Sequence, residues 1–279
     1  MSLGVVIKGP ECIVLATDSR VTLEAQKEGG PSISVNFDNA TKLLSFSKPH
    51  NYVGCVTYGA AVIGLRTANS FVPEFEQQVL AEKKNRLTVE EYSNELSRFF
   101  RERWNETMPS DYAGPNMTFV VGGYDSGAAY GKVFLFDIPR QPEAKQQHPG
   151  DKDFGMIWGG QLQVASRLIH GFDPALPDIV KKLLNVPDGQ IQQLHGTLRA
   201  DLQFPIPYAV LPLQDCVDLA IFLIRTTMIA QRLAIGVRGV GGPIDVAIIR
   251  RTNGLDYVQR KAIHGETDVD IVIEGGRKE

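Results

Sequence analysis

The chain opens with a short apolar hairpin that starts at its second residue. Residues 3–7 and 12–16 are apolar, and the Lys-Gly-Pro-Glu sequence at 8–11 between them is typical of a turn. Two strands joined by so short a connection pair antiparallel, so this hairpin dictates how a sheet begins. Ser2 therefore lies at the start of a strand, where rigid structure holds it in place.

Ser2 has the chemistry of a nucleophile that carries its own base. It follows an initiator Met, and aminopeptidases remove Met when the next residue is small. An α-amine has a pKa near ~8, so a large part of it is unprotonated at neutral pH. Such an amine supplies the general base that a Ser hydroxyl otherwise lacks. The alternative interpretation is an ordinary solvated chain start.

The residues after the hairpin form an ordered series of motifs. Asp-Ser-Arg at 18–20 follows the second strand, and Thr-Lys-Leu-Leu at 41–44 begins an apolar segment that ends in a Gly-rich stretch at 54–61. Later segments at 117–125 and 240–249 each combine a Gly-Gly pair with a strand sequence. This series resembles the β subunits of the proteasome and their bacterial relatives, a branch of the N-terminal nucleophile (Ntn) hydrolases. The likeness covers most of the chain.

The resemblance implies a fold of the α+β class. It is a four-layer αββα sandwich of two antiparallel sheets flanked by helices, formed here by a single domain over residues 1–279. Residues 139–153 and 172–212 are expected to be insertions relative to the family, the first with the composition of an exposed loop. The second, with a short helix expected at 178–184, either modifies subunit packing, covers the mouth of the site or has no role. An enlarged loop is expected around 28–31.

The sequence pattern alone indicates only a mixture of strands and helices. Apolar spacing predicts helices over 60–80, 162–170 and 213–233, with Pro73 interrupting the first. Another helix is predicted from Thr88, where Thr88 and Glu91 have the spacing of a capping box.

The resemblance also assigns a role to each of four site residues. Ser2 attacks a peptide carbonyl while its own amine, through a water, takes the hydroxyl proton. Lys42 lowers the pKa of the hydroxyl, and Asp18 keeps Lys42 charged and oriented. The backbone N–H of Gly59, or of Tyr58 in a register one residue away, binds the oxyanion. The alternative interpretations are that Lys42 is an ordinary surface lysine and that Asp18 is a structural carboxylate in a turn.

Substrate contacts follow from the same resemblance. Thr22 is expected to hold the substrate backbone by hydrogen bonds. The specificity pocket is expected to contain Val21, Ala40, Leu44 and Val56, which predicts an apolar residue before the cut.

Two departures from the family pattern bear on whether the protein is catalytically active. The nucleophile is Ser rather than Thr. The family's three supporting polar residues fall near Val237, Val240 and Gly159, which carry no polar side chains. Three functions therefore remain: a proteasome-like peptidase that self-assembles into rings and cleaves peptides or unfolded protein, a catalytically silent ring subunit, and an Ntn amidohydrolase acting on a small amide. No ATPase partner is identified.

Composition narrows the class of protein. The chain has 279 residues, of which 43% are hydrophobic, enough for one large core. A net charge of −3 predicts no nucleic-acid partner, and the absence of long apolar runs and of a signal peptide predicts a cytoplasmic protein without membrane contact. Cys12, Cys55 and Cys216 lie in apolar runs and are expected to be buried and reduced. The five histidines lack metal-site spacing, so neither metal nor cofactor is expected.

Overall fold

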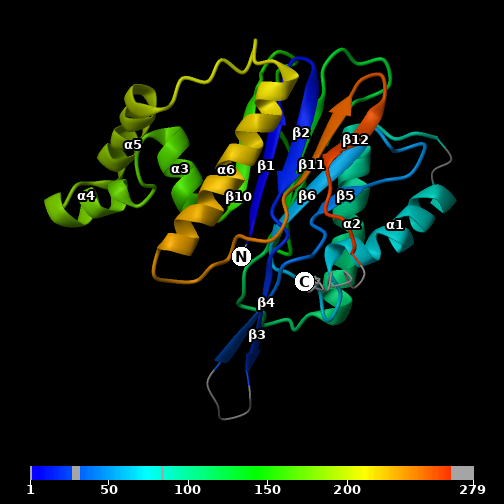
Figure 1. The fold of residues 1–279 in the computed structure, drawn as a ribbon, viewed down its shortest axis with the longest axis horizontal. Coiled ribbons are helices and arrows are strands. Elements are labelled where there is room, and N and C mark those ends of the chain that lie inside the picture. The colour runs from blue at the N-terminus through cyan, green and yellow to red at the C-terminus, as the bar shows by residue number, and fades with distance from the viewer. Residues whose placement is uncertain (1, 27–31, 83–84, 265–279) are drawn as a thin grey trace, which may run out of the picture.

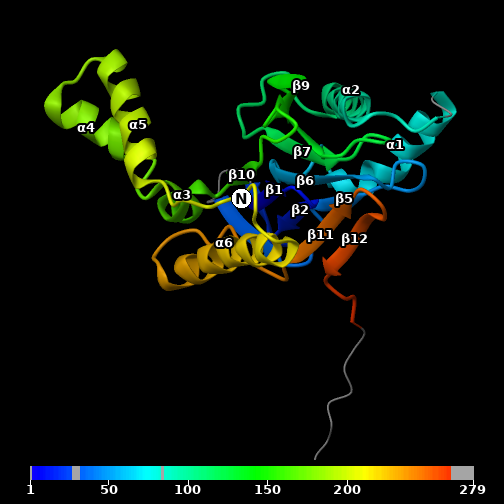
Figure 2. The same cartoon turned by 90° about the horizontal axis from the view of Figure 1, so that it is seen from above.

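Two five-stranded antiparallel sheets form the centre of the computed structural model, which describes residues 2–26, 32–82 and 85–264 (Figures 1 and 2). The strands of the first sheet are, in spatial order, β10 (Gly155–Gly160), β1 (Leu3–Lys8), β2 (Cys12–Thr17), β11 (Asp245–Arg250) and β12 (Gly254–Gln259). Those of the second are β5 (Leu43–Ser45), β6 (Val53–Gly59), β7 (Met117–Gly123), β8 (Lys132–Ile138) and β9 (Gln141–Gln147). A separate ribbon pairs β3 (Val21–Gln26) with β4 (Ser32–Phe37).

Helices cover the two sheets on their outer sides. The helices of the described residues are α1 (Ala68–Glu82), α2 (Val89–Thr107), α3 (Leu162–His170), α4 (Leu176–Leu184), α5 (Asp188–Leu202) and α6 (Leu213–Leu233). Helix α2 packs on β7, β8 and β9, whereas α6 packs on β1 and β2. Helices α4 and α5 project from the body as an arm (Figure 2).

The core consists of three clusters of buried apolar side chains. One, which includes Leu15, Val56 and Ile249, joins strands of both sheets and so lies between them. Another cluster lies between the sheet that contains β6 and the helices α1 and α2. The remaining cluster lies between the sheet that contains β1 and the helix α6. The sheets are therefore apolar on both faces, which explains why every residue of β1 and β2 is buried.

Local sequence signals predicted several elements correctly. The hairpin of residues 3–7 and 12–16 is confirmed as β1 and β2, with Gly4 opposite Thr17. The helices predicted at 162–170 and 213–233 are α3 and α6. The capping box of α2 is also present: the Thr88 hydroxyl accepts the Glu91 N–H at 3.2 Å, and the Glu91 carboxylate accepts the Thr88 N–H at 2.9 Å.

Three sequence predictions were wrong in part. The first long helix begins at Ala68 rather than at residue 60, and it continues through Pro73. Residues 141–147 form strand β9 rather than a loop, because their backbone pairs with β8 at the sheet edge. The helix expected at 178–184 is confirmed as α4, but the helix α5 that follows it was not predicted, although Ile191, Leu194 and Leu198 have helical spacing. The loop expected around 28–31 lies outside the described residues.

Candidate functional site

A small cavity at the start of β1 brings together Ser2 and Lys42. Val21 and Ala40 also line it, together with residues of β6 and the start of α1. Its volume of about 20 Å³ gives room for about one or two water molecules. Residues far apart in the sequence thus meet at one edge of the two sheets.

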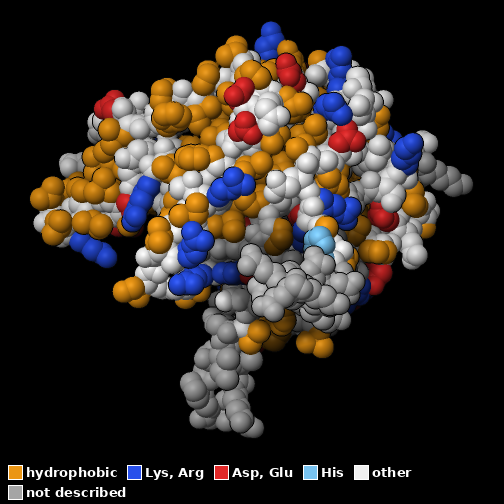
Figure 3. Space-filling model, in the orientation of Figure 1, with side chains coloured by type: hydrophobic (Ala, Val, Ile, Leu, Met, Phe, Trp, Pro, Cys, Tyr) orange, Lys and Arg blue, Asp and Glu red, His pale blue; other side chains and the backbone are white. Residues whose placement is uncertain are grey.

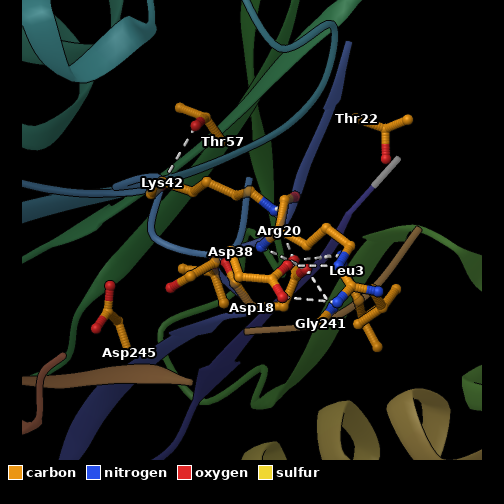
Figure 4. A network of polar contacts seen from close by, with 12 residues as sticks. Leu3, Asp18, Arg20, Thr22, Asp38, Lys42, Thr57, Gly241 and Asp245 are labelled. Carbon is orange, nitrogen blue, oxygen red and sulfur yellow. Dashed lines mark hydrogen bonds and ion pairs between the residues drawn. The ribbon is translucent and has the colours of Figure 1, made fainter. Parts of the chain in front are cut away.

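The carboxylate of Asp18 is the centre of the hydrogen-bond network beside this cavity (Figure 4). Its Oδ1 accepts the N–H of Leu3 at 3.1 Å and the ammonium of Lys42 at 2.8 Å. Its Oδ2 accepts the N–H of Arg20 at 3.2 Å and that of Gly241 at 3.0 Å. Because Asp18 is 1% exposed and follows β2 directly, it fixes both the beginning of β1 and the position of Lys42.

Lys42 is held as a buried cation. Its Nζ donates to Asp18 and to the carbonyl of Arg20, and its own carbonyl accepts the Thr57 N–H at 2.9 Å. Burial lowers the pKa of Lys42 below its ordinary 10.5, while the charge and hydrogen bond of Asp18 oppose that shift. Lys42 is therefore a poorly solvated positive charge in the wall of the cavity that Ser2 also lines.

The stability of the protein should consequently depend on the titration of Lys42. The pKa of Lys42 is lower in the folded protein than its ordinary 10.5 in the unfolded chain. At pH values between these two, the unfolded chain binds more protons than the folded one, so the free energy of unfolding rises with pH. Lys42→Met lacks this titration. Urea unfolding should show the wild type gaining stability relative to Lys42→Met from neutral pH to 10.5. A difference that stays constant, or falls, would contradict this expectation.

Ser2 is anchored by its backbone. It is 6% exposed, and its carbonyl accepts the N–H of Gln161 at 2.7 Å, while the next amide, that of Leu3, is held by Asp18. Met1 lies outside the described residues. The peptide group between Ser2 and Leu3 is thus held at both of its polar atoms, the carbonyl by the N–H of Gln161 and the N–H by the buried carboxylate of Asp18.

Gly59 ends β6 in a conformation that suits glycine. Its φ is +91°, and a Cβ there would meet the carbonyl oxygen of Asn116 at 2.0 Å. Tyr58 and Ala60 on either side of it line the cavity. The expected oxyanion donor therefore lies at the cavity wall, on a backbone that no larger residue fits without strain.

Tyr58 fills the space beside Gly159, one of the positions near which a supporting polar side chain was expected from the resemblance. A Cβ built on Gly159 would lie 2.1 Å from the Tyr58 ring, and one on Gly4 would lie 2.9 Å from it. Burial raises the pKa of Tyr58, so its hydroxyl stays protonated at neutral pH. Of the other two positions expected near supporting groups, Val240 is buried in the core and Val237 is 60% exposed.

Introducing a polar side chain at Gly159 should therefore cost stability. Gly159→Ser forces the Tyr58 ring to move, which we expect to lower the free energy of unfolding by about 1–3 kcal/mol. Gly189→Ser is the matched control, because a Cβ at Gly189 meets nothing within 4 Å. Urea unfolding of both variants measures the effect. Equal stability of Gly159→Ser and wild type would show that the ring does not occupy this space.

The remaining expected substrate contacts lie in different surroundings. The hydroxyl of Thr22 donates to the Oδ1 of Asn36 at 2.7 Å, on the β3–β4 ribbon. Leu44 and Val56 are fully buried in core clusters and do not line the cavity, in contrast to Val21 and Ala40. Neighbouring residues of a strand point to opposite faces of the sheet. The register of β5 and β6 therefore decides that the side chains of Leu44 and Val56 face the core.

Several contributing residues were not found from the sequence. Gln161 binds the Ser2 carbonyl through its N–H, and its side chain accepts from Gln231, which in turn binds the N–H of Val240. Lys261 forms an ion pair with Asp245, and its ammonium also donates to the hydroxyl of Ser19 in the motif at 18–20. No motif marks these residues, because only long-range contacts bring them to the site.

Other kinds of site receive no support within residues 2–26, 32–82 and 85–264. No group of three or more His, Cys, Asp or Glu side chains there is arranged to hold a metal ion. No helix in that part of the chain combines the length and apolar character needed to span a bilayer. Cys12, Cys55 and Cys216 are all buried and free.

Comparisons with known proteins bear on the fold. No protein-family model and no curated protein matches the sequence. Among solved structures, the chain is similar to a Gly-1 mutant of Anbu from Hyphomicrobium sp. strain MC1, with a TM-score of 0.55 and 14% identity over 94% of this chain and 86% of that one. It is also similar to Anbu (ancestral beta-subunit) from Yersinia bercovieri, with a TM-score of 0.53 and 18% identity over 93% and 88%. The chain therefore has the proteasome-like fold of these Anbu structures.

Proposed function

We propose that this chain is a proteasome-like peptidase whose nucleophile is the hydroxyl of Ser2 once Met1 is removed. The observation that carries the proposal is the shared carboxylate of Asp18, which binds the Lys42 ammonium and the amide that follows Ser2. A buried cation is thereby fixed beside a strand-anchored hydroxyl, on one wall of a water-sized cavity.

The reaction would begin with proton transfer from the Ser2 hydroxyl to its own amine through a water. The oxygen attacks the peptide carbonyl, and the positive charge of Lys42 favours the ionised oxygen. The backbone N–H of Gly59, or of Tyr58, stabilises the oxyanion, a contribution of about 3 kcal/mol in other hydrolases. The amine then returns the proton to the leaving amine, and a water hydrolyses the resulting ester to regenerate Ser2.

The proposal includes a particular architecture. The two sheets and their outer helices would form a four-layer αββα sandwich in one domain over 1–279, with 139–153 and 172–212 as insertions. Self-association into rings, in the cytoplasm and without a cofactor, is part of it. The α4–α5 arm supports self-association, since it exposes large apolar side chains that a monomer leaves in water. They are Ile179, Leu183, Leu184 and Leu202.

Two other functions each have one observation in their favour. A catalytically silent ring subunit is favoured by Val240 and Gly159, because neither provides a polar group to tune the amine of Ser2. An amidohydrolase for a small amide is favoured by the narrow cavity.

The first experiment measures the intact mass of purified, untagged protein before and after a β-lactone or epoxyketone probe. We expect loss of Met1 and a single adduct, and Ser2→Ala should form none. Mass photometry of the same sample counts the subunits of the assembly. Retained Met1, or an adduct that persists in Ser2→Ala, would overturn the mechanism and leave the silent subunit as the better function.

A further inference from the structure

A second cavity, about 200 Å³ in volume, lies between α6 and the turn that holds Asp18. We call it the arginine pocket. Four arginines line it: Arg20, Arg225, Arg232 and Arg238. Figure 3 shows basic side chains gathered beside the C-terminal half of α6.

The pocket carries an excess of positive charge. Arg20 is neutralised by Asp38, with contacts of 2.5 and 2.7 Å, and it also donates to the carbonyl of Arg238. Arg225 and Arg232 lie seven residues apart on α6 and so share a face. Within the described residues, neither of these two nor Arg238 forms an ion pair. Three guanidinium groups thus line one cavity to which the described residues contribute no carboxylate, and their mutual repulsion is relieved by binding an anion.

The wall of the pocket is continuous with the candidate active site. The N–H groups of Gly241 and Arg20 both donate to Asp18, and the Arg20 carbonyl accepts from Lys42. Val21, the next residue, lines the cavity that contains Ser2. The segment after β2 therefore contributes to both places, with Arg20 lining the arginine pocket and Val21 lining the cavity that contains Ser2.

We propose that the arginine pocket is a subsite for an Asp or Glu side chain of the peptide substrate, close to the bond that is cut. This inference rests on the proposed peptidase function. A guanidinium group binds a carboxylate through two parallel hydrogen bonds, which matches an acidic side chain. Met228, Ile229 and Val240 supply apolar walls for the aliphatic part of that side chain and for its neighbours in the peptide.

The test uses binding rather than turnover, so that it does not depend on catalysis. Fluorescein-labelled peptides of Ala and Leu carry one Glu at successive positions, each paired with the same peptide carrying Gln. Anisotropy is measured with the full-length Ser2→Ala protein. For at least one position we expect the Glu peptide to bind about 10- to 100-fold more tightly than its Gln partner, the range of a hydrogen bond to a charged group.

The arginines are then changed together in the same background. Replacing Arg225, Arg232 and Arg238 by Gln should reduce the affinity for the Glu peptide to that for the Gln peptide, which should itself be unchanged. Arg101→Gln, an exposed arginine on α2, is the matched control and should change neither affinity.

The outcomes separate this proposal from the peptidase function. Equal binding of Glu and Gln peptides at every position, or a Glu preference that survives the triple substitution, overturns the subsite. A change in assembly size with no change in peptide affinity also overturns it, because the pocket would then be an interface between copies of the chain. An arginine-dependent Glu preference in a protein that forms no Ser2 adduct would leave the peptide carboxylate site standing and remove the peptidase function alone.

Discussion

Replacing Ser2 by Ala is expected to reduce peptide cleavage on the order of 10⁶-fold, to the background of the assay, as loss of the nucleophile does in a serine peptidase. The fold should not suffer, because the sheet and the hydrogen bonds of the Ser2 carbonyl and the Leu3 amide involve only backbone atoms of the substituted segment. Hydrolysis of fluorogenic peptides with an apolar residue before the cut measures the loss, and urea unfolding checks the fold.

The control for Ser2→Ala is Ser2→Thr. It retains a hydroxyl beside the amine, and it carries the residue that the family uses, so it should retain activity and form the probe adduct. Met1 must be removed equally in all three proteins, which intact mass verifies. If Ser2→Ala cleaves at the wild-type rate, then Ser2 is not the nucleophile, and any activity belongs to another group or to a contaminant.

Replacing Asp18 by Ala is expected to lower the free energy of unfolding by about 3–5 kcal/mol, the usual result of removing one partner of a buried ion pair. The Lys42 side chain is 6% exposed and that of Asp18 is 0%, so solvent does not take over the lost contact. The substitution also removes the acceptor of the buried N–H groups of Leu3 and Gly241. Equilibrium urea unfolding measures the effect.

Asp38→Ala provides the comparison for Asp18→Ala. Asp38 also pairs with a basic residue, Arg20, but its side chain is 44% exposed, so its loss should cost no more than about 1 kcal/mol. Adding Lys42→Met to Asp18→Ala should recover part of the stability, because it removes the unpaired charge. If Asp18→Ala costs no more than Asp38→Ala, the Asp18 network does not hold the site together.

Elements whose signals are local could be predicted from the sequence. The beginning of α2 follows from Thr88 and Glu91, which are three residues apart and whose side chains each accept the other's backbone N–H. Helix α6 follows from its regular apolar spacing, and the first hairpin from two apolar runs around one turn. Strand β9 could not be found in this way, since its polar residues form a strand only because β8 offers a free edge.

The same distinction between local and long-range signals applies to the residues of the candidate site. The motif around Asp18, the Lys at 42 and the Gly-rich end of β6 are visible in the sequence as a series, and the resemblance assigned them their roles. The position of the Tyr58 ring over Gly159 could not be predicted from the sequence, because it depends on how the two sheets pack against each other. The same holds for the arginine pocket, which combines α6 with the segments on both sides of Asp18.

The sequence by itself determined the strand that begins after Ser2, the turn that follows β2 and the helices with clear periodicity, because these depend on residues within a few positions of one another. Only the tertiary structure decided which side chains reach the site. Asp18 and the amide of Gly241 are 223 positions apart and meet at 3.0 Å. Such a contact is formed when the apolar faces of the sheets and helices are buried together. Because that burial is not directional, the apolar pattern shows which face of an element is buried but not which elements meet.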